Sequence, residues 1–330
     1  MANAYALASR EQTRAPVFVL GAPRSGTTLL YHMLLSAGGF AVFRAETHVF
    51  DLLGPRFGDF GKLRNRRVLL EEWLRSNSFR ISGLDPARVE ELVLNHCRGR
   101  GDFLRKMMEE IAHCQQVDRW AECTPDHLLY VPEIKKEIPD ALIIHIIRDG
   151  RDVAVSAAKQ GWFRPFPWDR HRSVLVAGLY WEWVVGKGCA FGRMLGSDYL
   201  EVRFEQLLVD PTGTLARIGE FIGHDLEYER IRRVGIGSVS SPNTSFEVAK
   251  GFAPLGRWRE QLDREDKARL EFLLGNTLTR LEYPVSAVST KINEFELRRM
   301  KAIYPFWFEA KQWLKSHTAA GKFLVRTTIV

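Results

Sequence analysis

Residues 15–46, APVFVLGAPRSGTTLLYHMLLSAGGFAVFRAE, contain the pattern that decides the fold. The apolar run Val17–Leu20 predicts a buried strand, and the segment Gly21–Gly26 predicts a glycine-bounded loop. Apolar residues then recur at helical spacing and predict a helix that begins at Thr27. A loop between a strand and a helix presents backbone N–H groups and a helix N-terminus to a phosphate. The stretch therefore predicts an α/β fold with an anion-binding loop.

The loop is similar to the ATP-binding pattern G-x-x-x-x-G-K-[ST], but it lacks the lysine. Gly21 and Gly26 occupy the two glycine positions, and Thr28 occupies the final hydroxyl position. Thr27 stands where the pattern requires the lysine that reaches the β- and γ-phosphates. Arg24, inside the loop, can instead form paired hydrogen bonds with a nearer anion. The ligand is therefore expected to carry phosphate without being ATP.

The segment Pro23–Thr28, PRSGTT, resembles the 5′-phosphosulfate loop of the sulfotransferases that use 3′-phosphoadenosine 5′-phosphosulfate. Its form is nearest to the tyrosylprotein, carbohydrate and bacterial branches of that family. The resemblance implies a P-loop-NTPase-like three-layer fold with a central parallel sheet. It also implies the residues that bind the 5′-phosphosulfate of the cofactor, namely Arg24, Ser25, Gly26, Thr27 and Thr28.

A second motif follows the apolar run from Ala141 to Ile147, which predicts a strand buried on both faces of a parallel sheet. Arg148 comes directly after this strand, and Ser156 follows on a predicted helix. The family uses an arginine and a serine at this separation to hold the 3′-phosphate of the cofactor, so the resemblance assigns both residues to that phosphate. An alternative is a kinase-type strand in which Asp149 binds magnesium, although the missing lysine argues against it.

The resemblance implies two further cofactor contacts. Phe204, in the segment RFEQL, replaces the tyrosine that lies near the adenosine in relatives, and it keeps a ring for stacking. Arg257, in the segment Gly256–Trp258, is the expected second contact to the 3′-phosphate, with Lys250 as the alternative. An exposed arginine after a loop is an equally good interpretation of Arg257.

Glu46 is the candidate general base. It follows a short strand predicted at Phe40–Phe43, so it is expected at the edge where open parallel sheets bind ligands. An acceptor hydroxyl must lose its proton as it attacks sulfur, and Glu46-Thr47 resembles the glutamate and threonine of the tyrosylprotein sulfotransferases. A glutamate that pairs at a strand end is the alternative. His48 is the rival base, or else a residue of the acceptor pocket.

Two segments are expected on the acceptor side of the site, and the C-terminal tail is interpreted separately. The basic region of residues 51–119 predicts an insertion of helices that helps to form the acceptor site, or else a solvated charged surface. The loop Gly161–Trp168 is rich in aromatic residues and proline, and it predicts either a lid over the acceptor or a packed Ω-like loop. Trp162 is its candidate for acceptor contact. Residues 284–330 predict a helical extension that docks on the domain or associates with a membrane surface.

The segment WAECTP departs from the family at Cys123, where many relatives have a lysine that helps to neutralise the leaving phosphate. A thiol supplies no positive charge, so Arg24 or another residue must take over that task in an active enzyme. His127, nearby, is expected to shape the pocket or cap a helix. The departure keeps open the alternative of a catalytically inactive nucleotide-binding protein.

Composition indicates a globular enzyme, because the 330 residues are 45% hydrophobic and 26% charged, with a net charge of +7. We expect one sulfotransferase domain over residues 1–330. The four cysteines lack the spacing of a zinc site, and no metal is expected. We find neither a signal peptide nor an apolar run long enough to span a membrane, so we expect a cytoplasmic protein that binds no nucleic acid.

The reaction implied by the resemblance is O-sulfation. A sulfuryl group would pass in line from 3′-phosphoadenosine 5′-phosphosulfate to an acceptor hydroxyl and leave adenosine 3′,5′-bisphosphate, with Glu46 as base and Arg24 stabilising the developing charge. A P-loop kinase or nucleotidase is the alternative from another enzyme class. The acceptor stays open among a sugar, a lipid, a small metabolite and a peptide tyrosine.

Overall fold

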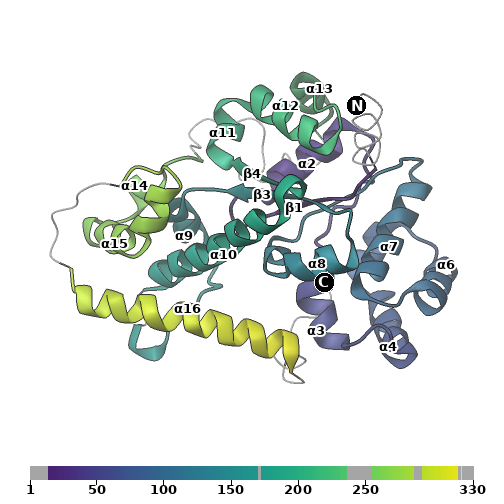
Figure 1. Cartoon of the computed structure of the whole chain (residues 1–330), viewed down its shortest axis with the longest axis horizontal. Helices are drawn as coiled ribbons and strands as arrows, with labels where there is room; N and C mark the ends of the chain where they lie inside the picture. The colour runs from purple at the N-terminus through teal and green to yellow at the C-terminus, as the bar shows by residue number, and fades with distance from the viewer. Residues whose placement is uncertain (1–13, 170–171, 236–253, 286–291, 319–320, 322–330) are drawn as a thin grey trace.

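The computed structural model of the protein describes residues 14–169, 172–235, 254–285, 292–318 and 321. Figure 1 shows a central sheet with helices above and below it, and one long helix, α16 (Glu294–His317), along the lower edge of the view. The predicted α/β class is therefore confirmed.

Four parallel strands form the sheet in the order β2-β1-β3-β4. β1 (Val17–Leu20) lies between β2 (Ala121–Glu122) and β3 (Leu142–Ile147), and β4 (Tyr199–Arg203) pairs with β3. Every residue of β1 and β3 is buried, as their apolar runs predicted. Because these strands run in the same direction, the segments that follow β1 and β3 emerge at one edge of the sheet.

The helices fall into three groups by their position in the chain. Those between β1 and β2 are α2 (Thr27–Ala37), a π-helix (Val49–Leu53), α3 (Gly54–Phe57), α4 (Leu63–Trp73), α5 (Asn77–Ser82), α6 (Pro86–Glu91), a second π-helix (Leu92–His96) and α7 (Arg100–Cys114). Those between β2 and β4 are α8 (Val131–Glu137), α9 (Gly150–Lys159) and α10 (Ser173–Leu195), with 3₁₀ helices at Pro125–Tyr130, Pro167–Asp169 and Gly196–Asp198. Those after β4, besides α16, are α11 (Phe204–Val209), α12 (Pro211–Ile222), α13 (Tyr228–Val234), α14 (Trp258–Gln261) and α15 (Arg264–Arg280).

Alternate residues of β1 face two separate hydrophobic cores. Phe18 and Leu20 belong to the core that includes α10 and the helices of the insertion, whereas Val17 and Val19 belong to the core that includes α2 and α12. Side chains along a strand point alternately to opposite faces of the sheet, so this division places helices on both faces. The arrangement is the predicted three-layer, P-loop-like fold with a helical insertion and a C-terminal helix.

The strand predicted at Phe40–Phe43 does not form, so that prediction was wrong. Phe40 makes one isolated parallel bridge with Arg119. Beyond it, the amide and carbonyl groups of Val42 hydrogen-bond to the side chain of Gln115, at 2.7 and 3.0 Å. A short apolar run indicates that a segment is buried, but it does not reveal whether a partner strand is available.

α10 needs separate mention because it is long and apolar. In the described part of the chain, Ser173–Asp198 is the one helical stretch whose length and mean hydropathy of 1.2 would suffice to cross a membrane. Half of the scored window is buried, and α10 packs against α9, α15 and α16. Buried core helices often have this composition, so the stretch is weak evidence for a span. The apolar run in the sequence predicts a long helix here, and Glu182 and Lys187 interrupt the run.

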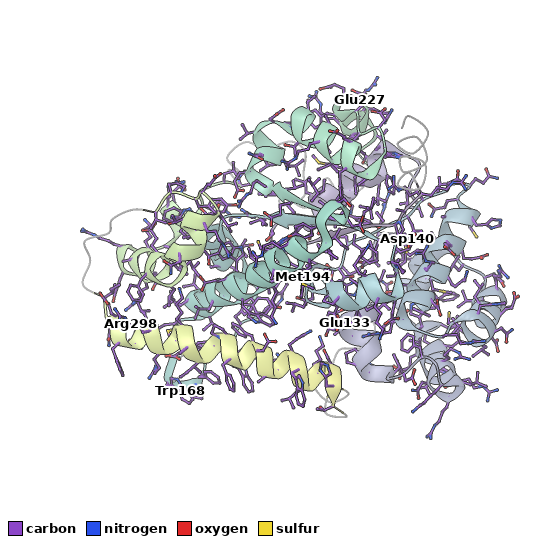
Figure 2. The ribbon with its side chains drawn as sticks, viewed as in Figure 1. Glu133, Asp140, Trp168, Met194, Glu227 and Arg298 are labelled. Atoms are coloured by element: carbon purple, nitrogen blue, oxygen red, sulfur yellow. The ribbon has the colours of Figure 1, made fainter. Side chains whose placement is uncertain are left out.

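α16 docks on the rest of the protein. The hydroxyl of Tyr304 accepts a hydrogen bond from the amide of Phe166 (3.0 Å) and donates one to Asp169 (3.1 Å). Asp169 also pairs with Arg299 of α16 (3.0 Å). Figure 2 shows Trp168, from the same loop, beside this helix. The aromatic loop and the C-terminal helix, which are far apart in the sequence, therefore lie together.

Candidate active site

The loop after β1 adopts a left-handed turn. Arg24 and Gly26 have positive φ angles, of 74° and 97°, and the amide of Ser25 donates a hydrogen bond to the carbonyl of Ala22 (3.0 Å). α2 begins at Thr27, and no side chain caps its N-terminus. The first amides of a helix have no acceptor within the helix, so they are available to an anion.

Phe204, the first residue of α11, packs against this loop. A Cβ atom at Gly26 would lie 2.2 Å from the ring of Phe204, so glycine is required at this position for the close approach as well as for its φ angle. The guanidinium of Arg148 lies over the same ring, 4.7 Å from its centroid. Phe204 therefore holds the loop and Arg148 in place, and its stacking on adenosine stays a prediction.

The two predicted anion-binding motifs meet. The Nε atom of Arg24 donates to the hydroxyl of Ser156 on α9 (3.0 Å), although 132 positions separate them. An Nη atom of Arg148 donates to the backbone carbonyl of Arg24 (3.2 Å). These contacts follow from the parallel sheet, because the segments after β1 and β3 leave it at the same edge.

Asp152 of α9 brings a third arginine to the same place. Its carboxylate accepts hydrogen bonds from the amides of Gly256 (2.8 Å) and Trp258 (3.0 Å), which fixes the backbone on both sides of Arg257. Lys250, the alternative to Arg257, lies outside the described residues.

The three arginines interact electrostatically. Burial lowers the pKa of Arg24 and of Arg148, and the charge of Arg257 lowers the pKa of both further. Like charges held this close destabilise one another, so an anion bound among them would offset the repulsion.

Two buried polar atoms at this site make no hydrogen bond within the described part of the chain. They are the hydroxyl oxygen of Ser25 and the Nε atom of Arg148. Buried polar atoms are normally paired, so each would gain a partner from a bound oxyanion. Together with the left-handed turn and the three arginines, they show that the residues present fit a ligand that carries phosphate or sulfate.

A series of carboxylates and imidazoles lies beside the loop. The Nε2 atom of His48 is 3.1 Å from the carboxylate of Glu46, and its Nδ1 atom is 3.1 Å from that of Asp51. Asp51 in turn is 3.2 Å from the Nε2 atom of His127, whose Nδ1 atom is 3.2 Å from Glu122. The series connects the half-exposed Glu46 to the buried end of β2.

The carboxylates raise the pKa of both imidazoles. Although burial opposes it, the hydrogen bonds that His48 donates to Asp51 and Glu46 raise its pKa to about 10. Burial is likewise outweighed at His127, where Glu122 and Asp51 raise the pKa to about 9. A charged imidazole donates from both nitrogens and cannot accept a proton, which argues against His48 as the general base.

Glu46 and the phosphate loop line the same cavity, which has a volume of about 650 Å³. The predicted site residues in its wall are Arg24, Gly26, Thr27, Thr28, Glu46, His48, Arg148, Trp162 and Phe204. Ser25, Ser156 and Arg257 are not in this wall, but the contacts above hold them next to Arg24.

Sequence reasoning missed the contribution of α16 to the cavity. Its residues in the wall are Tyr304, Trp307, Phe308, Lys311, Gln312 and Lys315. The aromatic and basic composition of the extension was visible in the sequence, but nothing in it placed the helix against the loop at residues 161–168. Tyr180 and Trp183 of α10 also line the cavity.

Cys123 is buried close to the site. Burial, together with the nearby Glu122 and Glu46, raises the pKa of the Cys123 thiol well above its ordinary value. The thiol is therefore neutral and supplies no charge for a leaving phosphate. Within the described residues, the positive charge at the phosphate loop comes from Arg24, Arg148 and Arg257.

Asp149 is not placed to bind magnesium. One of its carboxylate oxygens accepts from the amide and the Nε atom of Arg151 (2.9 and 3.0 Å), and the other accepts from an Nη atom of Arg151 (2.8 Å). Arg151 is itself buried and pairs with Glu271 (2.6 Å). The kinase interpretation thus loses its expected metal ligand.

A sequence profile described as "Sulfotransferase family" matches residues 16–228. The chain belongs to the sulfotransferase family. Its general activity is therefore sulfuryl transfer, as the resemblance of Pro23–Thr28 implied. The matched region of this sulfotransferase includes the phosphate loop, Glu46 and Arg148, and it ends before Arg257 and α16. No protein among the curated sequences matches it.

Two solved sulfotransferase domains share the fold. The domain from the Synechococcus PCC 7002 olefin synthase has a TM-score of 0.52 and 20% identity, with 75% of this chain and 88% of that one covered. The domain from the curacin biosynthetic pathway has a TM-score of 0.50 and 15% identity, with 82% of this chain and 98% of that one covered. At these identities the similarity concerns the fold alone, and it supports the three-layer architecture of this sulfotransferase.

Proposed function

We propose that this sulfotransferase transfers a sulfuryl group from 3′-phosphoadenosine 5′-phosphosulfate to an acceptor hydroxyl. The observation that carries the proposal is the 3.0 Å hydrogen bond between Arg24 and Ser156, which joins the two anion-binding motifs. A ligand with phosphate groups at both its 5′ and 3′ positions suits a site in which two such motifs adjoin. The general activity of the family supports the same reaction.

Each motif has its own task in this proposal. The amides that begin α2, with Arg24, Thr27 and Thr28, bind the 5′-phosphosulfate. Arg148, Ser156 and Arg257 bind the 3′-phosphate. Arg148 is suited to this because Phe204 and the carbonyl of Arg24 already fix its side chain, so little side-chain entropy is lost when the ligand binds.

Glu46 is the proposed general base. Bound cofactor supplies the sulfuryl group, which leaves the 5′-phosphate as its S–O bond breaks and a new S–O bond forms to the acceptor oxygen in line. Glu46 takes the proton of that hydroxyl, and Arg24 stabilises the negative charge on the departing phosphate oxygen. The charged His48 orients Glu46 through their 3.1 Å contact.

One observation favours a second candidate, a nucleotide-binding protein without turnover. The neutral Cys123 stands where relatives have a cation, so the leaving group has less electrostatic stabilisation than in those relatives.

Two variants test the proposal, with Glu90→Gln on the exposed side of α6 as the control. Glu46→Gln is expected to lower turnover at least about 100-fold while adenosine 3′,5′-bisphosphate binds as in the wild type. Arg148→Ala is expected to weaken that binding about 10- to 100-fold, because a charge-assisted hydrogen bond to phosphate is lost. Binding is measured by isothermal titration and turnover by mass spectrometry of the sulfated product. Full turnover in Glu46→Gln would remove the base from the mechanism, and tight binding without turnover in the wild type would favour the second candidate.

A further inference from the structure

The cavity wall beyond the phosphate loop is largely aromatic. Three segments contribute to it: the loop before α10, α10 itself and α16. Their aromatic residues in the wall are Trp162, Phe163, Phe166, Tyr180, Trp183, Tyr304, Trp307 and Phe308.

The rings form a continuous surface. Tyr180 contacts Phe163 and Phe308, with centroid separations of 5.0 and 5.3 Å, and Phe166 contacts Tyr304 and Trp307, with separations of 5.1 and 5.8 Å. Each of these six rings is thus held by a neighbour from another segment. Rings restrained in this way present flat apolar faces that lose little side-chain entropy when a ligand binds.

Three polar groups that belong to the aromatic residues of this wall already have protein partners. The hydroxyl of Tyr180 donates to Asp126 (3.1 Å), and that of Tyr304 donates to Asp169 (3.1 Å). The indole nitrogen of Trp183 donates to Glu309 (3.0 Å). These groups are therefore not available to a ligand, which meets ring faces instead of donors. A sugar hydroxyl placed against these ring faces would lack a partner, which is costly.

Part of this apolar surface is exposed. The exposed fraction is 55% for Trp162 and 45% for Trp307, although both belong to the cavity wall. Covering such rings with an apolar ligand is favourable, at roughly 25 cal/mol per Å² of apolar surface removed from water. The polar end of the same cavity, at Glu46, is where an acceptor hydroxyl has to be placed.

We propose that the acceptor is an apolar alcohol, a phenol or a long-chain aliphatic alcohol, whose body lies between α16 and the loop at residues 161–168. Its hydroxyl group then reaches Glu46 while its apolar part covers Trp162, Trp307 and Phe308. The proposal deepens the sulfuryl transfer proposed above and rests on it. α16 becomes the element that sets acceptor specificity.

Wild-type enzyme is tested first with three probes, 4-phenylphenol, 1-decanol and methyl β-D-glucoside. We expect kcat/KM for at least one apolar probe to exceed that for the glucoside about 100-fold, and the comparison of the phenol with decanol identifies the class. A glucoside sulfated as well as either apolar probe would overturn the acceptor proposal while leaving sulfuryl transfer in place. Absence of adenosine 3′,5′-bisphosphate binding would instead contradict the proposed function.

Two tryptophans of α16 provide a matched pair of variants. Trp307 lines the cavity, whereas Trp313, on the same helix and 55% exposed, does not. Trp307→Ala is expected to raise KM for the apolar probe about tenfold, with kcat and the affinity for adenosine 3′,5′-bisphosphate unchanged. Trp313→Ala is expected to leave KM, kcat and that affinity unchanged.

Direct binding of 4-phenylphenol to the enzyme loaded with adenosine 3′,5′-bisphosphate, measured by isothermal titration, gives a readout that does not need turnover. We expect Trp307→Ala to weaken this binding about tenfold relative to Trp313→Ala. Equal binding by the two variants, or no binding by the wild type, would overturn the proposal.

Discussion

The anion-binding part of the cavity and its aromatic part are built in different ways. The first consists of two short segments, each directly after a central strand, and its geometry is set by backbone turns and the parallel sheet. The second is assembled from side chains of three segments between residues 162 and 308. A site made by backbone geometry has a compact sequence pattern, whereas a site made by packing of distant side chains does not.

Because of this difference, two arginines of the cavity wall should have different effects on turnover and on nucleotide binding when they are replaced. Arg24 belongs to the anion-binding part and Arg164 to the aromatic loop. Arg24→Ala is expected to lower kcat about 1000-fold, because charge on the leaving phosphate loses its nearest cation, and to weaken adenosine 3′,5′-bisphosphate binding. Arg164→Ala should leave that binding within about twofold of wild type. Similar losses of adenosine 3′,5′-bisphosphate binding in both variants, measured by isothermal titration, would contradict the assignment of this binding to the part that contains Arg24.

Two glycines at the ends of α2 sharpen the contrast between packing and backbone strain. Gly26 and Gly38 both have positive φ angles, but only Gly26 would bring a Cβ atom against Phe204, since nothing lies within 4 Å at Gly38. Gly38→Ala should therefore cost only the backbone strain at this position, about 1 to 3 kcal/mol, seen as a Tm lowered by several degrees. Gly26→Ala should in addition displace the loop and weaken adenosine 3′,5′-bisphosphate binding at least about tenfold. Equal adenosine 3′,5′-bisphosphate binding by the two variants would mean that the ring of Phe204 can move aside without displacing the loop.

The charged imidazoles lie where the two parts meet, and they make stability depend on pH. The pKa values of His48 and His127, about 10 and about 9, lie above the value of about 6.5 for histidine in an unfolded chain. Their stabilisation is complete below pH 6.5 and is lost as the pH rises through 9 and 10. Tm is therefore expected to fall between pH 7 and pH 10.5.

Asp51→Asn removes the carboxylate that both imidazoles share, so this variant should have a lower Tm at pH 7 and a smaller further decrease at high pH. His113→Gln, at an exposed histidine, should follow the wild-type curve. If Tm measured by differential scanning fluorimetry fell with pH equally in wild type and Asp51→Asn, the pH dependence could not be assigned to His48 and His127.

The smallest effect is expected at Cys123. Because its thiol is neutral, Cys123→Ala should leave kcat within about twofold of wild type, with a modest loss of Tm from the lost packing. Cys189→Ala, at a second buried cysteine far from the loop in sequence, controls for packing alone. A large loss of turnover confined to Cys123→Ala would show that the thiol takes part in the reaction.

From the sequence alone it could be predicted that Arg24 and Arg148 would meet, but not how the aromatic part would be assembled. Val17–Leu20 and Leu142–Ile147 are uninterrupted apolar runs, and in a parallel sheet such runs predict both the strands and the edge where Arg24 and Arg148 meet. Trp162 was suggested by composition alone. No local pattern indicated that Trp307 would face the same cavity, because its position depends on how α16 packs.

The strand wrongly predicted at Phe40–Phe43 also depended on contacts with a distant part of the chain. Its apolar residues predicted burial correctly for Phe40, but strand formation depends on a partner elsewhere in the chain, and the side chain of Gln115 occupies the backbone groups of Val42. The rival base, His48, could be set aside only when its two carboxylate neighbours were known.

The contacts of Asp152 determine how far a shortened form of the protein must extend to keep the site complete. Its carboxylate grips the backbone on both sides of Arg257, beyond the last residue of the family match at 228. A shortened protein ending at that boundary would lose Arg257 and the whole of α16. Asp152 would also lose the two amides that donate hydrogen bonds to it. The smallest piece able to catalyse should therefore extend through residue 317, so truncation series that stop earlier should yield inactive fragments.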